Sequence, residues 1–338
     1  MKKIIYYITD HGRGHATRSI AVIRELKKLN FDIVVRNSSS FEFLKKSLPK
    51  TRIINGITDV GPSINDDGIS VNKNKSIQSI TKWIDDVEKI SNQEYSLIQK
   101  FNPDLIISDI SVMPLIAGNS FKVPTLTISN FSWYDVLKFL PNNTLQKIQQ
   151  FYDYSNLHIQ LPLSTPLNHF KNKKSVGLIS RKSTTNLFEL KEKLEIKEND
   201  FIVLLALGNS NEIMLNSDDN IKFLTINTKI KNNSINVTNW IEGQDLVSVA
   251  DLVICKCGYG FVSECLTNAT PFYYVASNNH LEQMAISSEL EKLGLKNRIS
   301  LDEIANINFT NKFMKNLPSL KLEKNDTHNA INLIQEYL

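Results

Sequence analysis

The feature that most constrains the fold is a short apolar run that ends in a glycine-rich turn and leads directly into a helical pattern. The run is Leu252 to Cys255, the turn covers 256–260, and the helical pattern covers 261–266. Apolar runs of this length are typical of strands buried in a parallel sheet. Free N–H groups and the helix dipole stabilise an anion at the start of the following helix. The sequence therefore predicts an α/β domain with a phosphate seat at this turn, although an ordinary structural turn has the same composition.

Polar side chains suited to a nucleotide surround this turn. Trp240 offers a flat face for a base, and Glu264 lies about one helical turn into the next helix, where it could accept ribose hydroxyls. Lys256 adds a positive charge for phosphate, and Glu282-Gln283 begin another helix after an apolar strand. Ligands bind at the carboxyl edge of open α/β sheets, and we expect these groups to meet there.

The N-terminus repeats the strand, glycine loop and helix order. Residues 4–8 are apolar, 10–15 read Asp-His-Gly-Arg-Gly-His, and the helical pattern covers 16–29. The third glycine of a dinucleotide fingerprint is missing, which argues against a dinucleotide site. His15, at the mouth of the helix, could take a proton from a hydroxyl or water. A structural alternative is that His15 only caps and packs the turn, and His11 and Asp10 are further candidates.

Asp109 closes the strand predicted over 105–108, at the carboxyl edge that also carries His15. A carboxylate in this place could orient the imidazole and stabilise its protonated form. The alternative is a cap for a helix that begins near Val112. Aromatic residues follow the strand predicted over 124–129, and Phe131 and Trp133 are either core or part of an acceptor surface.

These residues together resemble the nucleotide-sugar glycosyltransferases of the GT-B fold, among them the plant and macrolide enzymes and the peptidoglycan N-acetylglucosaminyltransferase. The resemblance is carried by Trp240, Gln244, Asp251, Gly258, Glu264, Pro271, Glu282, Gln283 and Gly294, and by Gly14-His15 with Arg18. It implies an α/β fold with two Rossmann-like domains facing across a cleft. It also implies that His15 is the general base and Asp109 its partner. The donor-binding residues that it implies are Gly14, Trp240, Gln244, Lys256, Gly258, Tyr259, Gly260, Glu264, Glu282 and Gln283. The loop that contains Gly208 and Asn209 could add backbone donors to the diphosphate, although an ordinary turn has the same composition. Two positions depart from the plant pattern. This chain has Lys256 where the plant enzymes have a His, and Gly243 where they have a Pro.

The chain length of 338 residues suits two domains. We expect an N-terminal acceptor-side domain over 1–162, a nucleotide-sugar-binding domain over 163–324, and a C-terminal helix over 325–338 that crosses back onto the first domain. The connection contains prolines and a basic cluster over 162–182. Apolar residues at helical spacing predict one long helix over 76–100.

Composition limits the classes of partner. The net charge is only +4, from 39 basic and 35 acidic residues, so nucleic acid is not an expected partner. Cys255, Cys257 and Cys265 are better explained by packing than by a metal site or a disulfide framework. The sequence shows neither a membrane-spanning run nor a signal-peptide core, and we expect a cytoplasmic protein, with membrane association left open.

We therefore expect an inverting, metal-independent glycosyltransferase that uses a nucleotide diphosphate sugar, with UDP implied by the resemblance. No Asp-x-Asp occurs in the sequence, so no cofactor is expected and the leaving-group charge falls on Lys256 and backbone donors. The acceptor is a sugar, lipid-linked or small-molecule hydroxyl, and a lipid-linked one would bring peripheral membrane contact. The pattern Gly12-x-Gly14-His15-x-x-Arg18 also resembles a nucleotide-sugar hydrolase of the same fold. A non-catalytic sugar-nucleotide-binding module is the third alternative.

Overall fold

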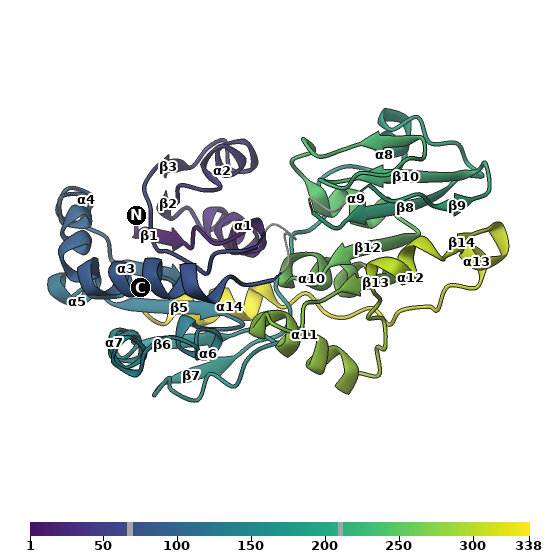
Figure 1. Cartoon of the computed structure of the whole chain (residues 1–338). Helices are drawn as coiled ribbons and strands as arrows, with labels where there is room; N and C mark the ends of the chain where they lie inside the picture. Colours follow the sequence, from purple (N-terminus) through teal and green to yellow (C-terminus); the bar gives the residue numbers. More distant parts are fainter. Residues whose placement is uncertain (66–69, 209–211) are drawn as a thin grey trace. The chain divides into compact units, whose positions relative to one another are not determined.

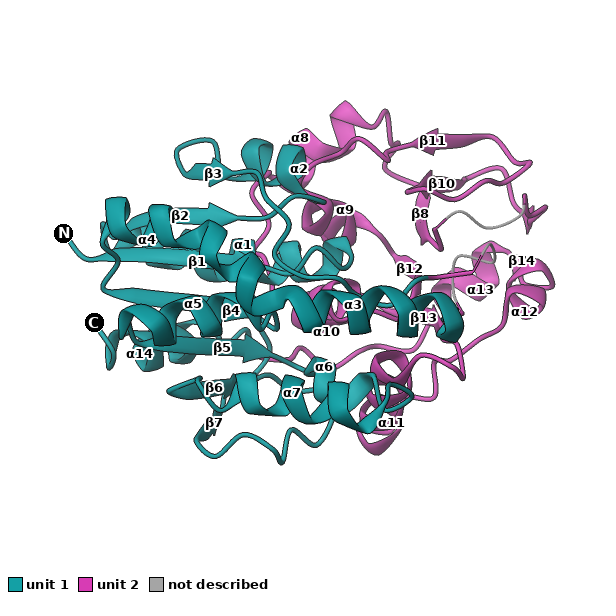
Figure 2. Cartoon of the chain, turned by 60° about the vertical axis from the view of Figure 1, so that its left-hand side comes forward, with its two compact units in different colours: residues 1–63, 71–179, 325–338 teal, residues 64–70, 180–324 magenta. Residues whose placement is uncertain are grey.

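The chain folds into two compact units in the computed structural model, which describes residues 1–65, 70–208 and 212–338 (Figure 1). Unit 1 comprises residues 1–63, 71–179 and 325–338, and unit 2 comprises 64–70 and 180–324 (Figure 2). Each unit is built on a parallel sheet covered by helices, as the buried apolar runs indicated. The predicted α/β class with two Rossmann-like sheets is confirmed.

Unit 1 has a sheet with the strand order β3-β2-β1-β4-β5-β6-β7, in which all of the pairs are parallel. Strand β1 is central, and its residues Ile4 to Ile8 are fully buried because helices cover both faces. The strands are β1 (Lys3–Ile8), β2 (Asp32–Arg36), β3 (Arg52–Ile54), β4 (Leu105–Asp109), β5 (Thr125–Ser129), β6 (Leu157–Gln160) and β7 (Lys173–Ser175). The helices are α1 (Arg13–Lys28), α2 (Phe41–Ser47), α3 (Lys73–Ser91), η1 (Asn92–Glu94), α4 (Tyr95–Phe101), α5 (Met113–Phe121), α6 (Trp133–Val136), α7 (Asn142–Tyr152) and α14 (Thr327–Gln335).

Unit 2 has a parallel sheet with the order β11-β10-β8-β12-β13, and a small pair β14-β9. Strand β12 lies between β8 and β13, so its carboxyl end is flanked by two further strand ends. The strands are β8 (Phe201–Ala206), β9 (Asn216–Ser217), β10 (Ile221–Thr225), β11 (Ser234–Asn236), β12 (Leu252–Lys256), β13 (Phe272–Val275) and β14 (Asn308–Phe309). The helices are α8 (Leu187–Lys193), α9 (Gly243–Val249), α10 (Tyr259–Asn268), α11 (Leu281–Lys292), α12 (Leu301–Ala305) and α13 (Asn311–Lys315).

The first unit extends further along the chain than the predicted boundary at 162. Strand β7 pairs with β6, so the segment expected to connect the domains forms the sheet edge, and unit 1 runs to Ile179. The segment 325–338 also lies in unit 1, where α14 packs on α1. Its buried residues Ala330 and Ile331 lie four and three positions before Ile334, so the three share one helical face.

The long helix predicted over 76–100 is interrupted. Helix α3 ends at Ser91, the single turn η1 follows, and α4 begins at Tyr95. The interruption coincides with Glu94, which is buried and accepts hydrogen bonds from Arg36 and Tyr7. These partners are remote in sequence, and periodicity in the helix itself gives no sign of them.

Candidate active site and donor-binding residues

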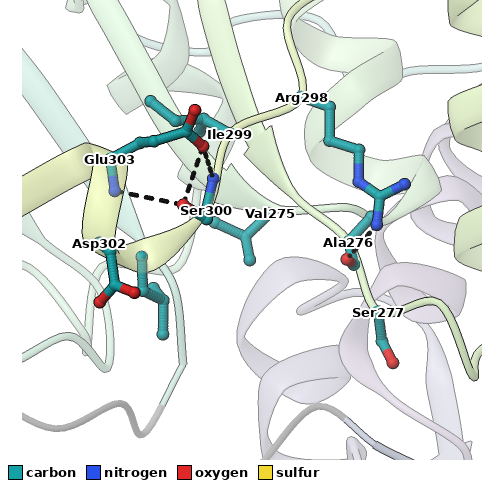
Figure 3. A pocket seen from close by; sticks show the side chains of 9 residues that line it. Val275, Ala276, Ser277, Arg298, Ile299, Ser300, Asp302 and Glu303 are labelled. Carbon is teal, nitrogen blue, oxygen red and sulfur yellow. Dashed lines mark hydrogen bonds between the residues drawn. The ribbon is translucent and has the colours of Figure 1, made fainter.

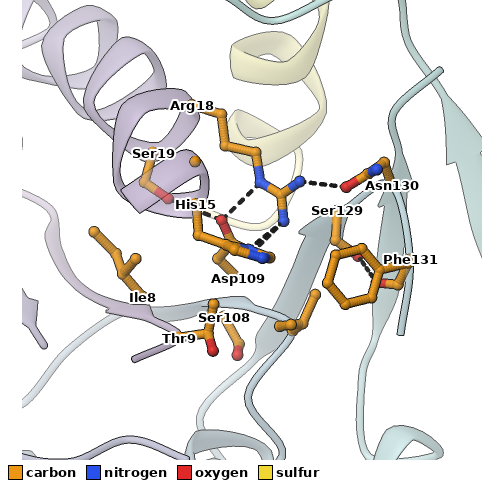
Figure 4. Close-up of polar contacts among 12 residues, drawn as sticks. Ile8, Thr9, His15, Arg18, Ser19, Ser108, Asp109, Ser129, Asn130 and Phe131 are labelled. Carbon is orange, nitrogen blue, oxygen red and sulfur yellow. Dashed lines mark hydrogen bonds and ion pairs between the residues drawn. The ribbon is translucent and has the colours of Figure 1, made fainter. Parts of the chain in front are cut away.

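His15 and Asp109 lie together at the carboxyl edge of the unit 1 sheet (Figure 4). Asp109 is the last residue of β4 and pairs with Ile8 of β1, and His15 lies in the first turn of α1. That helix begins at Arg13, three residues earlier than predicted, after Gly12 at φ 82°. The imidazole Nδ1 lies 2.8 Å from Asp109 Oδ1. If Nδ1 carries the proton, Nε2 has the free lone pair that a general base needs.

Arg18 completes a buried polar cluster around Asp109. Its Nε donates to Oδ2 at 2.8 Å and its Nη2 to Oδ1 at 2.5 Å, while Ser19 Oγ lies 3.1 Å from Oδ2. Arg18 Nη1 also donates to the side-chain oxygen of Asn130, as Figure 4 shows. Burial alone would raise the pKa of Asp109, but the charges of Arg18 and His15 and their hydrogen bonds lower it to about 2. Asp109 is therefore ionised at neutral pH.

The alternative role for Asp109 as a helix cap is wrong. Helix α5 has Val112 at its N-cap position and no side-chain cap hydrogen bond. The Asp109 carboxylate contacts His15, Arg18 and Ser19 instead.

Asp10 has a structural role that the sequence left open. Its Oδ1 accepts from the backbone N–H groups of Ser38 and Ser39, and its Oδ2 accepts from the N–H and hydroxyl of Thr58. One carboxylate thus ties together the segments that follow β1, β2 and β3. His11 packs edge-on against Trp133, with ring centroids 5.5 Å apart, which is a packing contact.

The aromatic residues after β5 are core. Phe131 and Trp133 are 1% and 4% exposed, and Phe131 packs edge-on against His15. The Trp133 indole N–H donates to Asp59, a buried carboxylate that also accepts from Thr9 and from the Asp10 backbone. Burial raises the pKa of Asp59 to about 6, although these hydrogen bonds lower it. Sequence reasoning missed Asp59, because it lies in a polar stretch without periodicity.

In unit 2, the predicted phosphate seat is the first turn of α10. Lys256 ends β12, Gly258 is the N-cap, and Tyr259 and Gly260 are the first two helical residues. The helix begins two residues earlier than predicted, so its first turn starts at Tyr259. The Tyr259 side chain is 2% exposed and packs in the core.

Glu264 lies in the same helix, and its carboxylate is already paired. Arg181 Nε donates to Glu264 Oε1 at 2.8 Å, and both side chains are 3% exposed. Burial raises the pKa of Glu264, against the opposing charge of Arg181. Arg181 was missed because its sequence position, in the stretch read as a domain connection, gives no hint of this partner.

Gln244 is fully buried in α9, and its amide orientation follows from its neighbours. Nε2 donates to Glu242 Oε2 at 2.7 Å and to the Lys182 carbonyl at 3.3 Å. Both partners can only accept, so the other amide atom must be the oxygen. Oε1 has no hydrogen-bond partner within the described part of the chain. A buried acceptor without a donor is costly, and a ligand N–H or O–H would satisfy it.

The other predicted donor residues lie in both units. Trp240, just before α9, and Glu282, in the first turn of α11, are half-buried, and buried Gln283 accepts from the Ser277 N–H at 2.8 Å. Gly208 follows β8 with φ 79°, a conformation that favours glycine. Gly14 belongs to unit 1, in the first turn of α1, where its carbonyl accepts from Thr17. Asn209 lies outside the described residues.

An open pocket of about 620 Å³ lies at the carboxyl end of β13 (Figure 3). Ser277 and Arg298 lie on one side, and Ser300 and Glu303 form a helix-capping pair on the other. The Arg298 guanidinium donates to the Ala276 carbonyl at 2.9 Å. The pocket therefore adjoins the segment that Gln283 holds.

The cysteines are packing residues. All three are free and buried, and burial raises the pKa of Cys255 to about 12.

Across 1–65, 70–208 and 212–338, no group of three or more His, Cys, Asp or Glu side chains could hold a metal ion. In the same residues, no helix is long and apolar enough to cross a membrane.

Solved structures share the fold over nearly the whole chain. The calicheamicin glycosyltransferase CalG4 aligns with a TM-score of 0.61 and 14% identity, covering 100% of this chain and 98% of that one. MurG of Acinetobacter baumannii aligns with a TM-score of 0.55 and 13% identity, covering 99% of this chain and 100% of that one. Arabidopsis thaliana UGT89C1, solved with UDP-L-rhamnose, aligns with a TM-score of 0.59 and 10% identity, covering 99% of this chain and 93% of that one. The fold is thus that of the GT-B glycosyltransferases.

Sequence comparison matches part of the chain to a known family. Residues 2–163 match the family model described as glycosyl transferase family 1. Residues 2–163, a little under half of the chain, are therefore similar to glycosyl transferase family 1. It is also 24% identical to the L-arabinokinase of Arabidopsis thaliana over 312 residues, which cover 85% of this chain. The match spans 29% of that relative, less than a third of its length.

Proposed function

We propose that the protein transfers a sugar from a nucleotide diphosphate sugar, with UDP as the favoured nucleotide, to an acceptor hydroxyl, with inversion and without a metal ion. The observation that carries this proposal is the 2.8 Å contact between His15 Nδ1 and the ionised Asp109. A base that is oriented by a buried carboxylate is what a direct displacement requires.

In the proposed reaction, His15 Nε2 removes the proton of the acceptor hydroxyl. The acceptor oxygen forms a bond to the anomeric carbon of the donor as the bond from that carbon to the diphosphate oxygen breaks. Asp109 stabilises the imidazolium that results. The charge that develops on the diphosphate is met by the N–H groups of the first turn of α10 and by Lys256.

The donor assignment rests on residues of unit 2. Gln244 Oε1 is a buried acceptor that a donor N–H or O–H would satisfy. Glu264 is assigned to the ribose hydroxyls, which its second oxygen would accept, and Trp240 is assigned to the base. Gln283, with Glu282, is assigned to the sugar. UGT89C1, which shares the fold, was solved with UDP and with UDP-L-rhamnose, and this favours UDP here. The proposed acceptor is the hydroxyl of a sugar, of a lipid-linked compound or of a small molecule.

A panel of nucleotide sugars tests the proposal, with nucleotide release followed in the presence and absence of candidate acceptors. We expect release that depends on an acceptor and a new glycosidic bond of inverted configuration. Release at the same rate in water alone would assign the hydrolase alternative. Binding of a nucleotide sugar without any release, across acceptors of all three classes, would favour a binding module.

A further inference from the structure

A single guanidinium joins two of the elements assigned to the nucleotide. Arg181 Nε donates to Glu264 Oε1 at 2.8 Å, and Arg181 Nη1 donates to the Ile241 carbonyl at 3.3 Å. Ile241 directly follows Trp240. The carboxylate assigned to the ribose and the backbone that carries the indole assigned to the base are therefore held by one side chain.

Stability alone does not account for this ion pair. Both partners are buried, and removing two charges from water costs about as much as their attraction returns. Apolar side chains of similar volume would serve a core equally well. Glu242 and Asp245 add negative charge near Glu264, which makes an ionised carboxylate there still more costly. A pair kept in such a place points to a role in recognition.

The chain around Arg181 is fastened on both sides, so the guanidinium has a fixed base. Before it, the hydroxyls of Ser180 and Thr267 lie 2.7 Å apart. After it, Asp245 accepts from the Thr184 N–H at 2.7 Å and from the Ser183 hydroxyl at 2.8 Å. These contacts attach segment 180–184 to helices α9 and α10, and they restrict the freedom that Arg181 would otherwise lose on binding.

Gly243 gives the guanidinium its space. A Cβ atom at position 243 would lie 3.3 Å from Arg181 Nη2, closer than ordinary van der Waals contact. A glycine at 243 and an arginine at 181 therefore fit each other sterically.

We propose that Arg181 is a positioning residue of the nucleotide site, which aims the Glu264 carboxylate at the ribose hydroxyls and holds the backbone beside Trp240. The inference rests on the proposed function, since it needs a nucleotide bound in unit 2. Arg181 acts through Glu264 and confers preference for a ribonucleotide over its 2′-deoxy counterpart.

Calorimetric titration with UDP and with 2′-deoxy-UDP tests the inference. A hydrogen bond to a charged group contributes enough free energy that the native protein should prefer UDP by about 10-fold or more. In Arg181→Lys the charge is kept but the planar fork is lost, so Glu264 is no longer aimed. The preference should fall to about twofold or less, with much of the stability retained.

Arg36→Lys is the matched control, because Arg36 is also buried, pairs with the buried Glu94 and donates to the carbonyls of Ile54 and Asn55. It should lose similar stability and keep the native preference. A native-like preference in Arg181→Lys would overturn the inference, and so would equal binding of both nucleotides by the native protein. No binding of UDP by the native protein would instead overturn the proposed UDP donor.

Glu264→Gln and the double variant Arg181→Gln/Glu264→Gln keep the test open if Arg181→Lys fails to fold. Glu264→Gln removes the counter-charge of buried Arg181, whereas the double variant removes both charges of the pair. If Arg181 acts through Glu264, the preference for UDP is lost in Glu264→Gln and does not change further in the double variant. A preference that survives in Glu264→Gln and disappears only in the double variant would show that Arg181 reads the ribose itself, contrary to the inference.

Discussion

The guanidinium Nη2 of Arg18 lies 2.6 Å from the imidazole Nδ1 of His15, and the two nitrogens converge on the same oxygen of Asp109. The arginine can only donate. If Nδ1 were unprotonated, Arg18 would donate to it, and the proton would move to Nε2, where it would block the proposed base. The position of the ring proton therefore decides whether His15 can act.

We expect His15 to carry its proton on Nδ1 in the neutral state, since the ionised Asp109 accepts it. Nitrogen NMR of the labelled protein reports the two ring nitrogens separately. In Arg18→Lys the fork that holds Asp109 is lost, and turnover should fall by about 10-fold or more, because the ring is no longer fixed. A native spectrum with Nε2 protonated would contradict this expectation.

Replacement of His15 by Ala should lower turnover by about 100- to 10,000-fold and leave UDP affinity nearly unchanged. Asp109→Asn should cost less in turnover, although it removes the carboxylate charge beside the buried Arg18 guanidinium, with a large loss of stability. His11→Ala is the matched control, since His11 lies in the same loop and packs edge-on against Trp133. Equal losses of turnover in His11→Ala and His15→Ala would contradict the assignment of His15 alone as the general base.

Replacement of Gln244 by Leu tests the unsatisfied buried acceptor. It removes the orphan Oε1 together with two hydrogen bonds that Nε2 makes, so the unfolding free energy should change by no more than about 1 kcal/mol. UDP affinity should fall by about 5- to 10-fold if Oε1 accepts from the nucleotide. Unchanged affinity by calorimetry would show that the nucleotide does not reach Gln244.

Asp59 should make the folded protein more stable as the pH falls from 6 to 4. Burial raises its native pKa to about 6, whereas an unfolded Asp titrates near 3.8. The native state then binds the extra proton, so the contribution of Asp59 to stability is fully present below pH 4 and lost as the pH rises through 6. The unfolding free energies of the native protein and of Asp59→Asn are measured with denaturant. The difference between them should change by about 1 to 3 kcal/mol over this range. A constant difference would show that Asp59 titrates normally.

Removal of divalent metal should leave turnover unchanged. The sequence contains no Asp-x-Asp, and we assign the leaving-group charge to Lys256 and the first turn of α10. Turnover is measured after dialysis against a chelator and again after magnesium or manganese is restored. A dependence on added metal would contradict the metal-independent mechanism.

Lys256→Ala tests whether Lys256 carries the leaving-group charge. This variant should lower turnover by about 10-fold or more.

Local pattern predicted the sheets and their loops, because a buried parallel strand is a continuous apolar run whatever its neighbours are. Strand β12 and its glycine turn, and β1 with the turn before His15, are of this kind. The rest depends on partners remote in sequence. Glu94 interrupts a periodic helix because Arg36 lies beside it, and Glu264 is paired because Arg181 returns to it. A carboxylate that ends a strand and one that ties three loops, Asp109 and Asp10, look the same in sequence.

Helix α14 packs on α1, although one lies near the end of the chain and the other near its start. During synthesis the part of α1 that α14 covers therefore lacks this partner until unit 2 has been made. At a usual elongation rate this takes roughly a quarter of a minute to a minute. Unit 2 is contiguous apart from residues 64–70 and can fold in that interval. The half of the protein that is translated first is thus the half that finishes folding last, and a chaperone that shields α1 has that interval in which to act.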